Sequence, residues 1–130
     1  MIDPMNSPTT IILYGIPNCD TVKKARAWLQ DQGLACQFHD FKKQGVPAER
    51  LAGWMAAVGW EKLLNRQGTT WRRLDAAVQA RAQDAESAAA LMREHPSVIK
   101  RPVVEWSGTP TGRVTVGFKA DAWRELAAGA

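Results

Sequence analysis

The segment 10–41 constrains the fold most, because it carries a strand pattern, a helix pattern and a second strand pattern in succession. Residues 10–16, "TIILYGI", are β-branched and apolar enough for a buried strand. Residues 20–32 place apolar side chains near one helical face, and Gly33 is a natural stop. Residues 35–41, "ACQFHDF", alternate as a strand does. A right-handed crossover through the helix then makes the two strands parallel neighbours.

The region after the second strand is helical. Helix patterns fall at residues 47–58, 60–64, 69–75, 75–82 and 84–96. Three of these segments begin with residues that favour a helix start. Pro47 suits a first helical position, and Thr69 or Thr70 suits a cap. Asp84 is a cap with Ser87 in its capping-box region.

The last third of the chain predicts a hairpin and a closing helix. Residues 98–106 form a strand pattern interrupted by Pro102, and residues 113–118 pair back across the turn 107–112. Residues 119–128 are helical. The whole order predicts an α/β protein, a small mixed β-sheet covered by helices, with an inserted helical region between the second and third strands.

The length of 130 residues suits one domain. We predict a flexible polar lead-in at residues 1–9 and a single domain over residues 10–130. No apolar stretch approaches the ~20 residues of a membrane-spanning helix. The N-terminus has no basic region followed by an apolar core, so we expect no secretory signal. With only two cysteines a reducing cytoplasm is the expected location.

The net charge of +4 makes the surface attractive to anions, although a solvated basic surface is an equal alternative. The basic residues are scattered and no DNA-reading helix is recognisable, so we expect no direct nucleic-acid binding. His39 and His95 show no metal-ligand spacing with the cysteines, so no metal site is predicted.

Cys19 lies where the first strand gives way to the first helix. Unpaired backbone N–H groups and the helix dipole favour an anion there, and Lys23 and Lys24 add positive charge. Asp20 opposes this effect, but it suits a helix N-terminus. The position predicts a thiolate nucleophile. The alternative is a small residue that only fills the cap region.

Cys36 begins the second strand, at the opposite end of the sheet from Cys19. Five residues of strand separate the two ends by about 16 Å. A disulfide tolerates Cα separations of only about 7 Å. We therefore expect Cys36 to be structural and unable to resolve an adduct on Cys19.

Several segments together resemble the arsenate-reductase-like (ArsC/Spx) family of the thioredoxin superfamily, and most closely its small bacterial YffB-type proteins. The segments are "LYGIPNCDTVKKARAWL", "FHDF", "GWEKLLNRQGTTWRRL", "DAESAAALMREHPSVIKRPVV" and "VGF", which span about residues 11–118. The resemblance implies a thioredoxin-like fold, a nucleophilic cysteine at the first helix N-terminus and a cis proline facing it.

Carried over by position, Cys19 matches the family nucleophile, Arg101 an oxyanion-binding arginine and Pro102 the cis proline. A cis X–Pro bond costs only about 0.5–1 kcal/mol over trans. Without the resemblance, Pro102 would be an ordinary strand-entry proline and Arg101 a surface cation.

The sequence departs from arsenate reductases at three places. The residues after the cysteine are Asp20 to Lys23 and not small and hydroxyl residues with an arginine. The family's second arginine falls on Asn65, with Arg66 one position along, and its third falls at 117–118. These departures argue against arsenate reduction. Val22 also replaces the second cysteine of the Cys-x-x-Cys switch found in the regulator branch.

The predicted activity is a glutathione-dependent thiol reductase with no tightly bound cofactor, because Cys19 has no resolving partner and needs an external thiol. Glutathione carboxylates would suit cationic groups. The residues predicted to bind the carboxylates are Lys23, Arg101 and Arg66. Asn65, Pro102 and Thr21 complete the predicted binding site. Thr21 is either a hydrogen-bond donor to the thiolate or an ordinary first-turn residue. A small thiol or disulfide substrate is the alternative to glutathione as the small-molecule partner.

A non-catalytic adaptor is the second interpretation, binding a larger protein such as RNA polymerase, as the regulator branch does. "TTWRRL" offers Trp71, Arg72 and Arg73 for such a contact, although a solvated basic turn is the simpler explanation. The six tryptophans are otherwise typical of core packing.

Overall fold

The computed structural model describes residues 11–107 and 112–128 of the 130-residue chain. The predicted lead-in at residues 1–9 and most of the predicted turn at 107–112 lie outside the described residues. Within the described ranges, no helix is both long and apolar enough to cross a bilayer.

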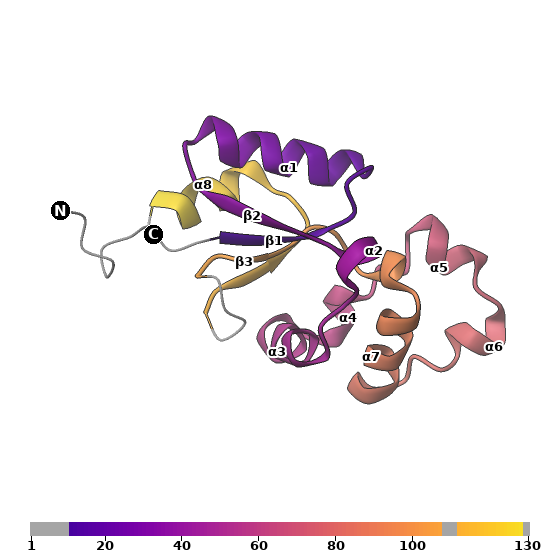
Figure 1. Cartoon of the computed structure of the whole chain (residues 1–130). Coiled ribbons are helices and arrows are strands. Elements are labelled where there is room, and N and C mark those ends of the chain that lie inside the picture. Colours follow the sequence, from indigo (N-terminus) through magenta and orange to yellow (C-terminus); the bar gives the residue numbers. More distant parts are fainter. Residues whose placement is uncertain (1–10, 108–111, 129–130) are drawn as a thin grey trace.

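A four-stranded mixed sheet forms the centre of the fold, in the order β2-β1-β3-β4 (Figure 1). Its strands are β1 (Ile11–Gly15), β2 (Cys36–Asp40), β3 (Val103–Glu105) and β4 (Val114–Val116). β1 pairs in parallel with β2, as the crossover predicted, whereas β3 is antiparallel to both β1 and β4. The predicted α/β class and mixed sheet are confirmed, and β4 is an edge strand.

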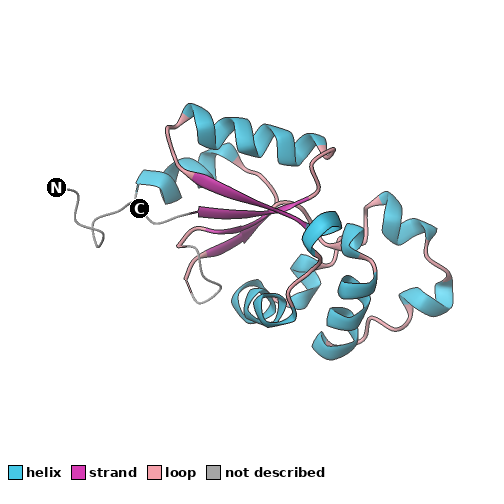
Figure 2. Cartoon of the chain, viewed as in Figure 1, coloured by secondary structure: helices cyan, strands magenta, loops and turns pink. Residues whose placement is uncertain are grey.

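Helices cover both faces of the sheet (Figures 1 and 2). The helical elements are α1 (Asp20–Asp31), α2 (Phe41–Gln44), α3 (Ala48–Val58), α4 (Trp60–Leu63), α5 (Thr69–Arg73), α6 (Ala76–Gln79), α7 (Ala85–Glu94), the 3₁₀ turn η2 (Pro96–Val98) and α8 (Ala120–Ala128). One core cluster joins α1 and α8 to the sheet through residues such as Val22, Leu13 and Trp123. A second cluster joins α3, α4 and α7 to the opposite face, so the inserted helical region is part of the core.

Of the three helix starts predicted from the sequence, two differ in the structure and one is confirmed. Gly68, and not Thr69 or Thr70, is the cap of α5, so both threonines lie inside the helix. Pro47 is the N-cap of α3 and not its first helical residue. Asp84 and Ser87 form the expected reciprocal capping box at α7, which satisfies backbone N–H groups at its start.

The predicted strand at 98–106 is wrong in its first half. Pro96–Val98 forms a 3₁₀ turn, and the strand begins only at Val103. The intervening residues bind the end of α4 instead, because the Lys100 N–H donates to the Leu63 carbonyl (2.7 Å) and Leu64 bridges Ile99. The predicted helix 75–82 is also shorter, at Ala76–Gln79.

One carboxylate, that of Glu105 on β3, lies in the core with no exposed surface. It accepts hydrogen bonds from the Tyr14 hydroxyl (2.8 Å) and from Trp54 Nε1 (2.8 Å). Arg50 of α3 forms an ion pair with the same carboxylate. A buried charge is tolerated only when it is paired and hydrogen-bonded. The three donors meet that need and tie β1 and α3 to β3.

Tyr14 is expected to ionise only when the protein unfolds. Burial, followed by the hydrogen bond to Glu105 and its negative charge, raises the Tyr14 pKa above the usual 10.0. The unfolded chain loses this proton near pH ~10 while the folded chain keeps it, so stability is intact below that pH and falls as pH rises further. Tyr14 is the single tyrosine of the sequence, so tyrosinate absorbance reports it alone.

The measurement is a pH titration followed by tyrosinate absorbance and circular dichroism on one sample. We expect the two signals to change together as one transition. A tyrosinate signal that rises near pH ~10 while the dichroism stays native would contradict the buried hydrogen bond. Tyr14→Phe serves as the control, because it removes the absorbance change altogether.

Candidate functional site

Cys19 is the N-cap residue of α1, with extended backbone angles (φ −95°, ψ 126°). Its N–H donates to the Ile16 carbonyl (3.3 Å), and its carbonyl accepts the Lys23 N–H (2.9 Å). The side chain is half-buried and packs against the core cluster of α1 and α8, as does Phe118. The thiol therefore stands where the unpaired N–H groups of a helix begin, while part of its surface stays accessible.

A close approach between Gly15 and Val22 sets how α1 starts relative to β1. A Cβ built at Gly15 would lie 2.8 Å from Val22 Cγ2, closer than real Cβ atoms come to a neighbour. Val22 is fully buried, so its side chain has little room to move. Gly15 thus allows the first turn of α1, and with it Cys19, to sit tightly on the end of β1.

Gly15→Ala is expected to lower the free energy of unfolding by about 1–3 kcal/mol, because an added methyl overpacks this contact. Urea unfolding measures the loss. Combining it with Val22→Ala removes the atoms that clash, so the double variant should lose less than the sum of the two single variants. Additive losses would show that the Gly15–Val22 approach does not position α1.

Arg101 and Pro102 lie at the same edge of the sheet as Cys19. Val103 pairs with Tyr14, so the preceding Pro102 lies beside the end of β1 from which the chain leads to Cys19. The Arg101–Pro102 peptide is cis, as the resemblance implied. Pro102 is buried and its carbonyl accepts the Gly117 N–H (2.9 Å), whereas Arg101 is half-exposed.

Asn65 and Arg66 reach this region through backbone pairing. The Asn65 N–H donates to the Val98 carbonyl (2.7 Å), which fixes the loop after α4 beside the segment leading to Arg101. The Asn65 side chain accepts the Gln67 N–H (3.1 Å). The Arg66 guanidinium lies over two rings, 5.5 Å from the Trp60 centroid and 5.9 Å from that of Trp71. Aromatic contacts of this kind hold a cation in place.

These two residues line a cleft of about 570 Å³ that we call the cationic cleft. Its charged lining residues are Lys62, Arg66, Lys100 and Lys119, against the one carboxylate of Glu61. Lys100 passes over Gly117, whose φ of +79° and lack of a side chain leave room for it: a Cβ there would lie 3.2 Å from Lys100 Cε. Such an excess of cations suits an anionic ligand.

The three lysines of the cationic cleft, Lys62, Lys100 and Lys119, are not among the site residues predicted from the sequence. Lys100 stands next to Arg101 in the sequence, which is a local signal, but nothing local brings Lys62 and Lys119 to it. Cys19 and Arg101 are not among the residues that line this cleft. The structure therefore places the predicted site residues in two neighbouring groups, one at the start of α1 and one in the cleft.

Thr21 and Lys23 lie on the first turns of α1, with exposed side chains. Among the described residues no hydrogen bond joins the Thr21 hydroxyl to the Cys19 sulfur. Their roles as a donor and as an anion-binding group stay predictions.

Cys36 lies at the other end of the sheet, because it pairs with Ile11, the first residue of β1. Both cysteines are free thiols. Burial raises the pKa of the Cys36 thiol, against a lowering influence from the Arg26 charge. The separation expected between Cys19 and Cys36 is confirmed. Throughout the described ranges, no three His, Cys, Asp or Glu side chains form a metal-binding group.

Comparison with known proteins places the chain among relatives of similar length. The model of the ArsC family matches residues 14–126. An uncharacterised protein of Haemophilus influenzae is 38% identical over 108 residues, covering 83% of this chain and 90% of that protein. The global transcriptional regulator Spx of Streptococcus agalactiae is 26% identical over 116 residues, covering 88% and 80% of the two chains.

Solved structures agree with the sequence relatives. The YffB protein shares 49% identity and superimposes with a TM-score of 0.81, over 88% of this chain and 96% of that one. An arsenate reductase (ArsC) related protein from Brucella melitensis shares 47% identity with a TM-score of 0.67, over 89% and 92%. With a family match that spans most of the chain and a fold shared with these structures, the protein belongs to the ArsC family.

Proposed function

We propose that the protein is a glutathione-dependent thiol–disulfide reductase with Cys19 as its nucleophile. The observation that carries the proposal is the placement of Cys19: a half-exposed thiol at the N-cap of a twelve-residue helix. The other cysteine pairs with the far end of β1. A single thiol in this position suits chemistry in which the second thiol comes from solution. A reducing compartment such as the cytoplasm would supply it.

The proposed reaction consists of two exchanges. The Cys19 thiolate attacks the glutathionyl sulfur of a mixed disulfide, so a Cys19–glutathione disulfide forms and the substrate leaves as a thiolate that takes up a proton. A glutathione thiolate then attacks the glutathionyl sulfur on Cys19. Oxidised glutathione leaves and the Cys19 thiolate is restored. The substrate disulfide is reduced, and two glutathione units end as one disulfide.

Charge supports glutathione as the co-substrate. The two carboxylates of glutathione need cations. Arg101 lies at the same end of the sheet as Cys19, and Lys23 lies on the helix that Cys19 caps. Arg66, whose guanidinium lies over the Trp60 and Trp71 rings, and Asn65 are part of the lining of the neighbouring cationic cleft. We assign these four residues to glutathione binding, with Pro102 beside the adduct and Thr21 donating to the Cys19 sulfur.

The test is modification of the two thiols by oxidised glutathione, followed by intact-mass spectrometry and peptide mapping. We expect one glutathionyl group, on Cys19, which reduced glutathione removes. Alkylation measured against pH gives the matched control within the same molecule, because burial raises the Cys36 pKa. We expect Cys19 to be alkylated faster than Cys36, whose thiol burial holds in the less reactive protonated form. Equal reaction of both thiols, or exclusive reaction of Cys36, would end the proposal.

A second candidate function is that of a non-catalytic adaptor for a larger protein such as RNA polymerase. The observation that favours it is the similarity to the transcriptional regulator Spx over 88% of this chain. Arg72 and Arg73 on α5 are exposed and offer a basic contact, whereas Trp71 is half-buried against the core. An adaptor would keep its partner after Cys19→Ala and lose it after Arg72→Glu with Arg73→Glu. A reductase would do the reverse with its substrate.

A further inference from the structure

The outer edge of β4 carries backbone groups that no described strand pairs. The Trp106 N–H donates to the Arg113 carbonyl (2.9 Å), and the Gly117 N–H donates to the Pro102 carbonyl (2.9 Å). Backbone groups of an antiparallel pair alternate in direction every second residue, so those of Thr115 also face β3. The N–H and C=O groups of Val114 and Val116 therefore face away from the sheet. An open edge of this kind is a template for another strand.

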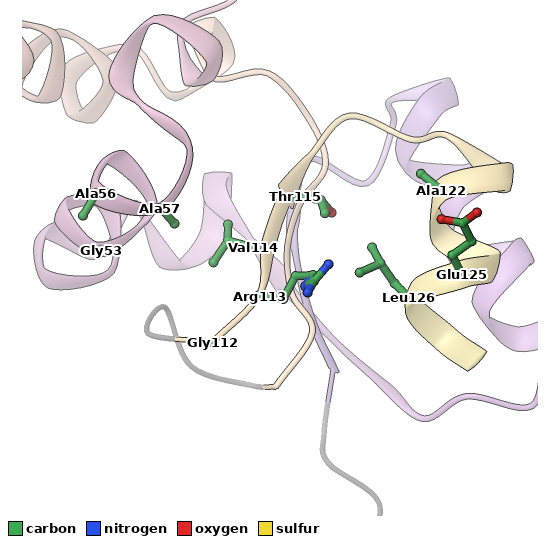
Figure 3. A pocket seen from close by; sticks show the side chains of 10 residues that line it. All are labelled: Gly53, Ala56, Ala57, Gly112, Arg113, Val114, Thr115, Ala122, Glu125 and Leu126. Atoms are coloured by element: carbon green, nitrogen blue, oxygen red, sulfur yellow. The ribbon is translucent and has the colours of Figure 1, made fainter. Parts of the chain in front are cut away.

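The edge lies in a groove of about 860 Å³ between two helices (Figure 3). One wall is α3, which presents only the small residues Gly53, Ala56 and Ala57. The other wall is α8, which presents Ala122, Glu125 and Leu126. An added strand would have alternate side chains pointing to either wall. Because the α3 wall is made of such small residues, it leaves room for apolar side chains.

This groove continues into the cationic cleft. Val114 and Thr115 line both hollows, so β4 runs from the groove at its start, which Arg113 also lines, to the cationic cleft at its end. Four cations and one carboxylate line the second part. A ligand that follows β4 thus meets mostly small and apolar side chains along one half, together with Arg113 and Glu125, and an excess of positive charge along the other half.

We propose that β4 binds an extended peptide segment as a fifth, antiparallel strand of the sheet. Antiparallel pairing makes the segment run from the cationic cleft to the groove, so acidic residues precede apolar, β-branched ones. About eight residues, at ~3.4 Å each, cover both parts. The partner is a flexible acidic–apolar segment of another protein. This surface does not include Cys19, but its cationic cleft shares Asn65 and Arg66 with the residues proposed to bind glutathione. Peptide binding does not need the Cys19 thiol, so the proposal goes beyond the reductase activity.

The probe is a fluorescent peptide, Asp-Glu-Asp-Glu-Val-Thr-Val-Leu, titrated with the whole protein and followed by anisotropy. We expect a Kd on the order of 10–100 μM, typical of a small and transient interface. Nuclear magnetic resonance should show shifts in the Val114 and Val116 amides, with Cys36 unaffected. No binding, or shifts centred away from β4, would overturn the proposal. A dimer formed through β4 that leaves the peptide unbound would overturn it as well.

Matched variants separate the parts of the surface. Ala57→Glu in the groove should weaken binding about 10-fold or more, whereas Ala52→Glu, exposed on the same helix outside the groove, should leave it unchanged. Val116→Pro removes one outward N–H group without touching the β3 ladder, and should weaken binding similarly. Equal affinities for Ala57→Glu and Ala52→Glu would reject the groove.

The contribution of the cationic cleft is tested with the double variant Lys62→Glu and Lys119→Glu. Lys43→Glu is the control, because Lys43 is exposed and lies outside the cleft. The double variant should lose affinity about 10-fold or more, and so should the wild type in high salt. Cys19→Ser should bind like the wild type, so failure of the reductase proposal and failure of this one give different results. An unchanged affinity in the double variant would refute the cationic half.

Discussion

Cys19→Ser is expected to slow the glutathione-dependent reduction of a glutathionylated thiol by on the order of 10³-fold or more, because a serine hydroxyl cannot form the disulfide with glutathione. A serine hydroxyl has nearly the same size, so the N-cap of α1 should stay intact, since serine is itself a favoured cap. The measurement is the rate of oxidised-glutathione formation with a glutathionylated small-molecule substrate, with circular dichroism to show that the fold is kept.

Cys36→Ser is the matched control for that result. Cys36 pairs with the start of β1, at the end of the sheet away from Cys19. Its replacement should leave the rate within about twofold, as expected for a residue that does not take part in the chemistry. A rate that survives Cys19→Ser, or one that fails with Cys36→Ser in a folded protein, would contradict the assignment of the nucleophile.

Glu105→Ala is expected to lower the free energy of unfolding by about 3–5 kcal/mol, the usual cost of breaking a buried ion pair by removing one partner. Tyr14 and Trp54 lose their acceptors as well, and buried donors without acceptors are costly. Arg50 loses a partner in the same step. The measurement is urea unfolding followed by circular dichroism, extrapolated linearly to zero urea.

Glu94→Ala is the matched control, because it removes a carboxylate from an exposed ion pair with Arg81. Exposed pairs of this kind contribute at most about 1 kcal/mol. Glu105→Gln keeps the volume and one acceptor, so we expect a loss between those of the two alanine variants. Equal losses for Glu105→Ala and Glu94→Ala would show that the buried network does not hold β3 to α3.

Local patterns predicted those parts of the fold in which one segment decides its own structure. The apolar run before Cys19 and the helix after it are confirmed almost residue by residue, because burial and periodicity agree there. The segment 98–106 has a pattern that predicts a strand interrupted by Pro102. Its first half binds the end of α4. That pairing is made with residues more than thirty positions away, and no local pattern contains it.

The candidate site divides in the same way. The resemblance implies that Pro102 faces Cys19, and the register of β1 and β3 brings Pro102 to the end of the sheet at which Cys19 lies. The lysines of the cationic cleft come from three segments joined only by long-range contacts. In the sequence Glu105 is a polar residue near the end of a strand pattern, which predicts an exposed side chain. Its burial depends on the hydrogen bonds from Tyr14 and Trp54 and the ion pair with Arg50.

The aromatic rings of the core cluster that Cys19 packs against offer an intrinsic fluorescence signal for this site. Phe118 packs edge-on against Trp28 (6.3 Å between centroids) and Trp123 (4.7 Å). Cys19 packs against this same cluster. Indole emission responds to the polarity and packing around the ring, so we expect a group attached to the Cys19 sulfur to change the tryptophan emission through this cluster. Such a change would allow modification of the Cys19 thiol to be followed by intrinsic fluorescence without a label.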